Sequence, residues 1–177
     1  LKNGLSAPPK LTPKTVANLL TKWSWGIGML GAKRRHFGNI VGHVQGVSDT
    51  AALGAWTAEQ FDLTLDWNKI AKLMEMWDGK VILKGILDPE DAKMAAKLGA
   101  DAIIVSNHGG RQLDGALSSI RMLRPILDAV GGETEVHLDS GIRSGQDVLK
   151  ALAMGAKGTM IGRAFVYGLG AMGRKGV

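Results

Sequence analysis

Four short segments of strand character recur in the later part of the chain and alternate with helical segments. They lie at 81–84, 102–106, 135–139 and 158–162. Two of them contain unbroken apolar runs that are too short for a helix, and such runs are typical of parallel strands buried on both faces. The alternation of strands and helices therefore predicts an α/β fold with a parallel sheet and right-handed crossovers.

Two stretches of the chain, 85–100 and 141–156, repeat each other without gaps. In each copy a capping residue, Asp88 or Ser144, precedes the helical part, and a glycine ends it. Asp88 is followed by proline, which suits the first position of a helix. The repeat predicts two strand and helix units of the same construction.

A further helix is predicted between the two copies, after Ser118 and Ser119, although Pro125 weakens its apolar pattern. The chain of 177 residues then holds four strands. A complete eight-stranded barrel usually needs about 250 residues. The sequence therefore predicts one half of a TIM (β/α)8 barrel, and the other half would come from residues outside this sequence.

Residues 1–55 have a different character, because prolines, glycines and a basic cluster at 33–36 interrupt any sustained strand pattern. We expect a helix near residues 15–22 and a long excursion over the mouth of the barrel. The expected division is 1–55 for this excursion and 56–177 for the half barrel, a single domain truncated at both ends. The first residue is Leu1 rather than methionine, which favours a fragment.

The composition is that of a globular domain, with 45% hydrophobic and 21% charged residues. The chain has no cysteine, which excludes disulfides, thiolate metal sites and cysteine nucleophiles. No pair of histidines has metal-ligand spacing, so no metal is expected. No apolar run reaches the roughly 18 to 20 residues of a membrane span, and no signal peptide is visible. We expect a cytoplasmic protein, with peripheral attachment at the inner face of the membrane as the alternative.

The net charge of +6 and the pI near 9.7 would suit a nucleic acid or an anionic membrane surface. No basic stripe interleaved with aromatic residues accompanies the charge, so nucleic-acid binding is not predicted. A basic module that docks on an anionic surface stays open as an alternative function.

Polar and charged residues follow each predicted strand. Active sites of such barrels lie at the carboxyl ends of the strands, and this rule selects four places. A cation stands at each of them, and cations buried beside apolar strands favour an anionic ligand. Alternatively, these cations form a structural network with Asp139 and Asp114. The four places are Lys84-Gly85, Ser106 to Arg111, Asp139 to Arg143, and Gly162-Arg163.

Two of these places are suited to a phosphate. Gly141 and Gly162 allow backbone N–H groups to approach an anion closely, next to helix N-termini. Barrels commonly hold a phosphate after the seventh and eighth strands. If the last two strands here are those strands, Asp139 to Arg143 and Gly162-Arg163 form the phosphate and ribityl end of a mononucleotide site.

The loop from Ser106 to Arg111 is suited to a small hydroxy acid. Histidine changes its charge near neutral pH, so His108 can serve as a general base. Arg111 carries a planar fork that binds a carboxylate through two hydrogen bonds. A base and a carboxylate-binding group three residues apart fit a 2-hydroxy acid.

The run Ser106-Asn107-His108-Gly109-Gly110-Arg111-Gln112-Leu113-Asp114 resembles the signature of FMN-dependent 2-hydroxy-acid dehydrogenases and oxidases. The resemblance extends from about Pro8 to Val177. Within that family, the stretches 56–61 and 168–173 are most similar to cytochrome-linked L-lactate dehydrogenases. The resemblance implies strands 5 to 8, the C-terminal half, of an FMN-binding barrel.

The resemblance also implies roles for individual residues. His108 would be the base that takes a proton from the substrate, and Arg111 would bind the substrate carboxylate. Lys84 and Ser106 would contact the flavin, and Asp139 would bind the ribityl hydroxyls. The remaining cofactor-binding positions are Ser140, Gly141, Ile142, Arg143, Gly162 and Arg163. Of these, Arg143, Gly162 and Arg163, together with nearby backbone, would hold the phosphate. Some relatives have glycine at the position of Ser140.

The implied reaction is oxidation of an L-2-hydroxy acid, with L-lactate as the leading substrate and pyruvate as product. The implied electron acceptor is a quinone, a cytochrome or oxygen, and a homo-oligomer is expected for the full-length protein. Further site residues would come from the missing N-terminal half of the barrel, so the isolated chain is expected to be inactive. A non-redox phosphate-binding barrel enzyme is the alternative.

Overall fold

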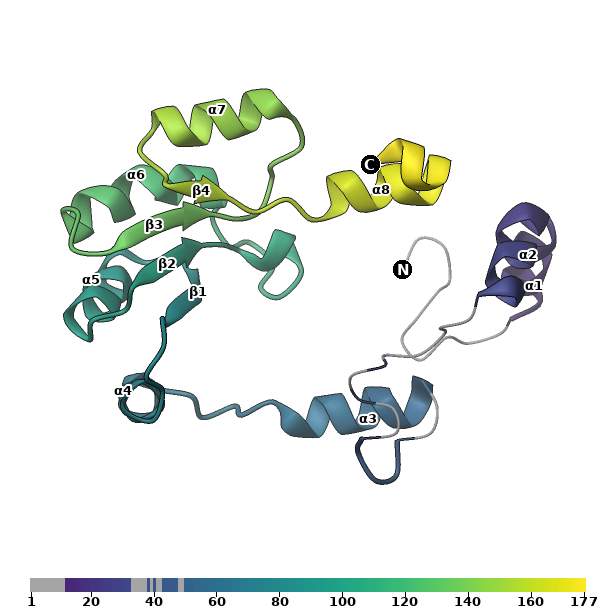
Figure 1. Cartoon of the computed structure of the whole chain (residues 1–177), viewed down its shortest axis with the longest axis horizontal. Helices are drawn as coiled ribbons and strands as arrows, with labels where there is room; N and C mark the ends of the chain where they lie inside the picture. Colours follow the sequence, from purple (N-terminus) through teal and green to yellow (C-terminus); the bar gives the residue numbers. More distant parts are fainter. Residues whose placement is uncertain (1–11, 33–37, 39, 41–42, 48–49) are drawn as a thin grey trace. The chain divides into compact units, whose positions relative to one another are not determined.

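The computed structural model describes residues 12–32, 38, 40, 43–47 and 50–177, and the chain forms two compact units (Figure 1). The first unit spans residues 1–65 and the second spans residues 66–177. The predicted division after residue 55 stays a prediction, and a helix runs across that position. None of the helices in the described ranges has the length and apolar character that crossing a membrane requires.

The described residues of the first unit form three helices, α1 (Pro13–Leu20), α2 (Trp23–Gly31) and α3 (Thr50–Gln60). The helix predicted near 15–22 is confirmed, but it starts and ends two residues earlier than predicted. It starts at Pro13 because the Thr12 hydroxyl caps it and accepts the N–H of Thr15 at 3.2 Å. The other two helices were not predicted. The basic cluster at 33–36 lies outside the described residues.

The second unit is built on a parallel sheet of four strands in the order β1-β2-β3-β4. All four predicted strands and their parallel direction are confirmed. The last strand is shorter than predicted because β3 ends at Leu138, which leaves no ladder partner beyond Met160. The strands are β1 (Ile82–Ile86), β2 (Ala102–Val105), β3 (Glu135–Leu138) and β4 (Gly158–Thr159).

The helices between the strands start and end where the sequence predicts. Asp88 and Ser144 cap their helices through side-chain oxygens, and Ser144 forms a reciprocal capping box with Asp147. Pro125 lies inside a helix without ending it. The burial of Leu123 in the core stabilises this helix and offsets the cost of the proline. The helices of this unit are α4 (Trp67–Glu75), α5 (Pro89–Lys97), α6 (Ser119–Val130), α7 (Gly145–Ala153) and α8 (Arg163–Met172), with short 3-10 turns η1 (His108–Gly110) and η2 (Gly173–Gly176).

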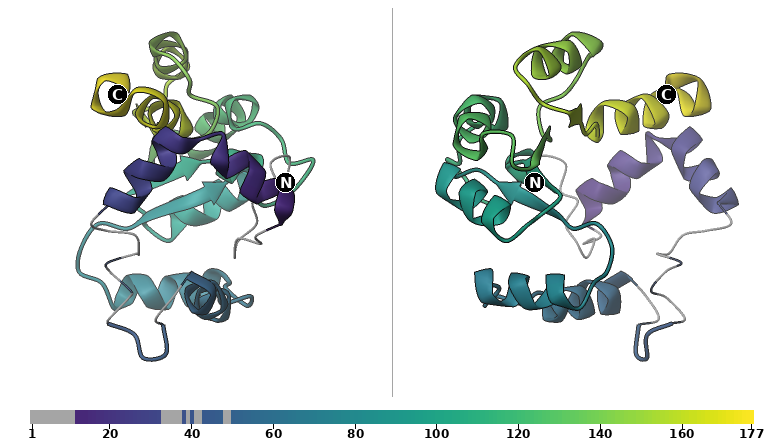
Figure 2. Two further views of the ribbon diagram at one scale, coloured as in Figure 1. Left: turned by 90° about the vertical axis from the view of Figure 1, so that its right-hand side faces the viewer. Right: turned by 60° about the vertical axis from the view of Figure 1, so that its left-hand side comes forward.

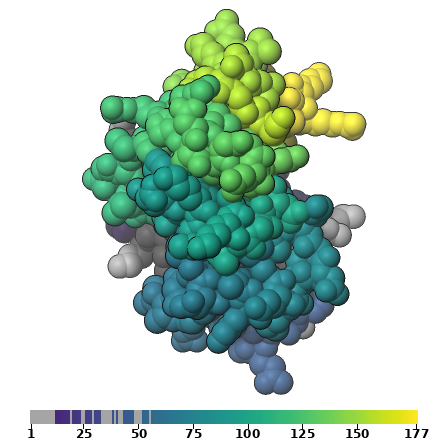
Figure 3. Space-filling model, turned by 90° about the vertical axis from the view of Figure 1, so that its left-hand side faces the viewer, coloured from purple at the N-terminus to yellow at the C-terminus, as the bar shows by residue number. Residues whose placement is uncertain are grey.

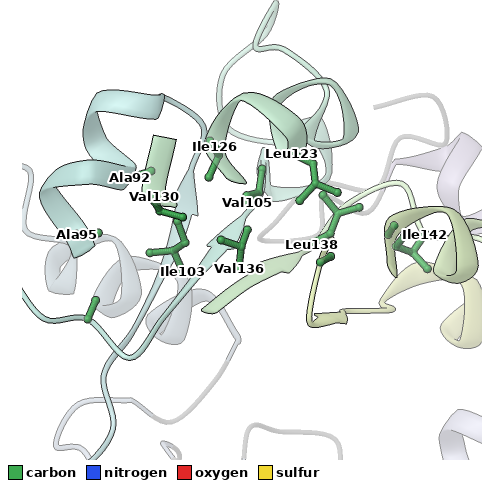
Figure 4. Packing of buried hydrophobic residues seen from close by; sticks show 13 residues of the cluster. Ala92, Ala95, Ile103, Val105, Leu123, Ile126, Val130, Val136, Leu138 and Ile142 are labelled. Carbon is green, nitrogen blue, oxygen red and sulfur yellow. The ribbon is translucent and has the colours of Figure 1, made fainter. Parts of the chain in front are cut away.

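The core lies between the sheet and the helices α5 and α6 (Figure 4). Figure 2 shows these two helices side by side along the sheet, and Figure 3 shows the outer surface that α5, α6 and α7 present. Alternate residues of β2 and β3 point into this core, and α5 contributes alanines that allow close approach. The buried cluster includes Ala92, Ala95, Ile103, Val105, Leu123, Ile126, Val130, Val136 and Leu138.

The alternation that buries these residues fixes the opposite face as well. Lys84, Ser106 and Asp139 are out of phase with Val105 and Leu138, so they project from the other face at the carboxyl ends of the strands. The ladder between β1 and β2 is irregular just after Lys84, where Gly85 has a φ of 101°. Such bulges redirect neighbouring side chains.

Candidate functional site

The carboxyl ends of the strands surround one cavity of about 680 Å³. Of the predicted site residues, all except Ser106 line it, and Ser106 lies directly beneath, bonded to Lys84 and Asp139. The four separate segments predicted from the sequence therefore meet at one place. The predicted residues in the lining are Lys84, His108, Arg111, Asp139, Ser140, Gly141, Ile142, Arg143, Gly162 and Arg163.

Ser106 joins the polar groups at the floor of the cavity. Its side chain is only 2% exposed, and its hydroxyl donates to Asp139 Oδ2 at 2.5 Å. Ser106 Oγ also accepts from Lys84 Nζ at 3.1 Å and from the backbone N–H of His108 at 3.0 Å. A hydroxyl has one donor and two acceptor positions, so these bonds use all of them. Ser106 thus links three strand ends.

Asp139 carries the negative charge at this floor. Burial raises the pKa of its carboxyl, but hydrogen bonds from Ser106 and Lys84, together with the charge of Lys84, outweigh burial and lower the pKa below its ordinary value. Lys84 Nζ lies 2.9 Å from Asp139 Oδ2. The carboxylate is therefore ionised at neutral pH and holds the ammonium group at the cavity.

The remaining cations of the site are not neutralised in the same way. Among the described residues, no carboxylate lies within 4 Å of the guanidinium group of Arg111, Arg143 or Arg163. The alternative of a structural ion-pair network therefore applies to Lys84 and Asp139 and not to the arginines. An excess of guanidinium groups around a cavity favours an anionic ligand.

The loop that carries His108 has an unusual backbone. His108, Gly109 and Gly110 have φ values of 55°, 70° and 69°, in the left-handed region that non-glycine residues rarely adopt. The side chain of Asn107 accepts the N–H of Gly110 at 3.1 Å and closes the η1 turn. This conformation brings both His108 and Arg111 to the lining of the cavity.

The turn after β3 shares this feature. Ser140 and Gly141 both have a φ of 81°, so Ser140 occupies a conformation that favours glycine. The Ser140 hydroxyl accepts the N–H of Gly109 at 2.9 Å, and the Ser140 carbonyl accepts from the buried hydroxyl of Ser119 at 3.1 Å. The sequence placed Ser140 at the site but gave no sign of its contact with the His108 loop.

The two helix N-termini near the cavity differ in their capping. At α7, the carboxylate of Asp147 accepts the N–H groups of Arg143 and Ser144. At α8, no side chain caps the helix, and Gly162, Arg163 and Ala164 line the cavity. An uncapped helix N-terminus with arginines beside it has the donor set that a phosphate group requires.

Sequence reasoning missed three lining residues, Met160, Ala164 and Tyr167. Ala164 and Tyr167 lie on the first turns of α8, and predicting that helix would have placed Tyr167, four residues after Arg163, on the side of Arg163. A smaller cavity of about 340 Å³ lies beside the Ser140-Gly141 turn and is lined partly by residues of α6 and α7.

Comparisons with known proteins agree with this arrangement. The sequence model described as FMN-dependent dehydrogenase matches residues 1–177. An L-lactate dehydrogenase of Actinobacillus pleuropneumoniae serotype 5b (strain L20) is 51% identical over 158 residues, which cover 88% of this chain and 40% of that protein. An L-lactate dehydrogenase of Haemophilus influenzae (strain PittEE) is 46% identical over 181 residues, which cover 100% of this chain and 46% of that protein.

Solved structures give the same picture. The monotopic membrane protein (S)-mandelate dehydrogenase matches with a TM-score of 0.88 at 34% identity, over 99% of this chain and 46% of that one. A mandelate oxidase with (S)-4-hydroxymandelic acid matches with a TM-score of 0.65 at 48% identity, over 72% of this chain and 36% of that one. The chain thus spans less than half the length of these relatives.

The lowered pKa of Asp139 predicts a pH-dependent contribution to stability. A carboxyl whose pKa is lower in the folded state stabilises the fold above its unfolded-state pKa, about 3.9, and loses that contribution as the pH falls through the folded value. Asp139→Asn should therefore lower the free energy of unfolding by about 1 kcal/mol at pH 7. The difference from the unmodified protein should shrink towards pH 3 in urea titrations, and a constant difference would contradict the ion pair.

Proposed function

The chain belongs to the FMN-dependent dehydrogenase family, and we propose that it carries the cofactor and substrate residues of an enzyme that oxidises L-lactate to pyruvate. The main support is that His108, Arg111 and the uncapped start of α8 line one cavity, because these groups suit a base, a carboxylate-binding residue and an anion site. The names of the relatives with 45 to 51% identity support L-lactate over other L-2-hydroxy acids.

The donor set of the cavity fits FMN, the cofactor of the family. The N–H groups at the start of α8, with Arg143 and Arg163, would hold the phosphate, and Asp139 would accept hydrogen bonds from the ribityl hydroxyls. Lys84 would place its positive charge against the flavin ring, with Ser106 below. The backbone of Ser140, Gly141 and Ile142 would border the ribityl chain. FMN, when bound, supplies the acceptor for the two electrons of the substrate.

The His108 loop would handle the substrate. Arg111 would bind the carboxylate of the hydroxy acid through its planar fork, which fixes the orientation of the molecule. His108, three residues earlier, would take a proton from the substrate as general base. Lys84 would stabilise negative charge that develops beside it.

We further propose that the chain is the C-terminal half of the barrel, strands 5 to 8. Its four parallel strands and its coverage of 40 to 46% of the lactate dehydrogenase relatives support this assignment. Apolar side chains at both sheet edges are exposed, including Ile82 in β1 and Met160 and Ile161 after β4. The other half would cover these edges and complete the active site. The electron acceptor, homo-oligomer formation and the cytoplasmic location stay predictions.

A specific observation supports peripheral attachment to a membrane as well. Trp23, Ile27 and Leu30 recur at helical spacing along α2 and are 71%, 62% and 74% exposed, and Lys22 precedes them. An exposed apolar helix face that begins beside a lysine is suited to the interface of an anionic bilayer. One structural relative is described as a monotopic membrane protein. We propose that α2 docks on anionic lipid.

The proposed reaction is tested by His108→Ala in the full-length protein. Loss of the general base should slow the reduction of bound flavin by L-lactate by about 10² to 10⁴-fold, measured as anaerobic bleaching of the flavin absorbance. Arg111→Lys keeps the charge but loses the fork, and should raise the KM for lactate by about tenfold or more. His43→Ala, on an exposed residue of the first unit, is the control and should react normally.

Two outcomes would overturn this proposal. Normal flavin reduction in His108→Ala would show that His108 is not the general base. A full-length protein that purifies without flavin and takes none up would favour the non-redox phosphate-binding enzyme instead.

The half-barrel assignment predicts the behaviour of the isolated 177-residue chain. Its unpaired sheet edges and exposed apolar side chains should make it self-associate, and it should not turn over lactate. Analytical ultracentrifugation and a lactate assay measure both. A soluble monomer that unfolds cooperatively and oxidises lactate would contradict the assignment.

Membrane docking predicts binding of the full-length protein to vesicles that contain anionic lipid. The double variant Trp23→Ser and Ile27→Ser should bind at least about tenfold more weakly in vesicle sedimentation, because it loses two apolar side chains at the interface. Leu63→Ser is the matched control, since Leu63 is also exposed but lies outside α2. Equal binding by all three proteins would exclude α2 as the docking element.

A further inference from the structure

Gly109 is held from both sides by residues of other strand ends. Its N–H donates to the Ser140 hydroxyl at 2.9 Å, and its carbonyl accepts from Arg163 Nη2 at 2.9 Å. Gly109 follows β2, whereas Ser140 follows β3 and Arg163 follows β4. Three neighbouring strand ends therefore meet at the residue next to His108.

The backbone of the loop needs such support. A non-glycine residue in the left-handed region, such as His108, costs about 1–2 kcal/mol and persists only where the surroundings hold it, whereas Gly109 and Gly110 adopt this region readily. The N–H groups of His108 and Gly110 are bonded within the loop, to Ser106 and Asn107. The bonds at Gly109 come from the segments after β3 and β4.

Both partners of Gly109 are fitted closely to it. Ser140 has a φ of 81°, a conformation that glycine would adopt at lower cost, yet glycine has no side chain to accept the Gly109 N–H there. On the other side, a Cβ at position 109 would collide with the guanidinium group of Arg163. The contact therefore depends on a serine, a glycine and an arginine together.

The same partners face the cavity in which we place the cofactor. Ser140 and Arg163 line that cavity, and the Ser140 hydroxyl also lies 3.3 Å from Asp139 Oδ2. A guanidinium group has five N–H donors. Arg163 can therefore keep its bond to Gly109 while other N–H groups bind a phosphate oxygen.

We propose that Ser140 and Arg163 are positioning residues that hold Gly109 from both sides, and so couple cofactor binding to the placement of His108 and Arg111. This inference rests on the proposed function. Binding of the phosphate would fix the guanidinium group and, through it, the loop. The base and the carboxylate-binding residue would then be held most firmly when the cofactor is bound.

The test uses the full-length protein and Ser140→Gly, which removes the hydroxyl and relieves the backbone at that position. Amide hydrogen exchange of residues 107–111 is measured with and without FMN. In the unmodified protein FMN should slow exchange in this loop. In Ser140→Gly the Gly109 amide should exchange about tenfold faster, and flavin reduction by lactate should slow about tenfold, while FMN affinity changes only a few-fold.

Arg163→Lys is the second variant and remains informative if Ser140→Gly does not fold. It keeps a positive charge for the phosphate but loses the fork that can bind two partners at once. FMN at saturating concentration should then no longer slow exchange of the loop. Retention of the full FMN effect in Arg163→Lys would overturn the coupling.

Thr134→Val is the matched control for a general loss of stability. Its hydroxyl is buried and donates to the Ala100 carbonyl at 2.7 Å, at the opposite end of β3 from the cavity. This variant should be less stable but should show normal loop exchange and normal flavin reduction. Faster loop exchange in Thr134→Val, or unchanged exchange in Ser140→Gly, would overturn the inference.

The failure of this inference is distinguishable from failure of the proposed function. If the unmodified protein neither binds FMN nor reduces it with lactate, the proposed function fails. If it does both while Ser140→Gly and Arg163→Lys leave the loop and its response to FMN unchanged, only the coupling fails.

Discussion

Parallel pairing of four strands is the constraint on which the rest of the structure depends. It places all four carboxyl ends at one edge, so residues as distant in sequence as Lys84 and Arg163 line one cavity. It also requires a crossover connection between successive strands, and of the helices in these connections α5 and α6 bury their apolar faces on the sheet. The period of two along each strand then divides the residues between the core and the opposite face.

Hydrogen bonds to the Asp139 carboxylate organise the polar edge. This group holds Lys84 and accepts from Ser106, whose hydroxyl in turn receives the backbone N–H of His108. One ionised carboxylate is thereby connected to two neighbouring strand ends. The arginines around it keep their charge available, so the edge as a whole is suited to anions.

Local sequence signals predicted much of this fold. Caps at Asp88 and Ser144 and short apolar runs fixed the four strands and the helices α5, α6 and α7 to within a few residues, whereas α3 and α4 were not predicted. The helices α2 and α8 were missed because their glycines and nearly continuous apolar residues hide the helical period. The predicted site residues lie together, since strand ends can be located from sequence. The bonds of Ser140 and Arg163 to Gly109 depend on tertiary contacts and have no local signature.

The unequal ends of α7 and α8 give the cavity a direction. Asp147 satisfies the N–H groups at the start of α7, so the partial positive charge of that helix is compensated within the protein. The corresponding charge of α8 has no side-chain cap and adds to that of Arg163. The start of α8 therefore attracts anions more strongly than the start of α7. An elongated ligand with a single negatively charged end is expected to bind in one orientation, with that end at α8.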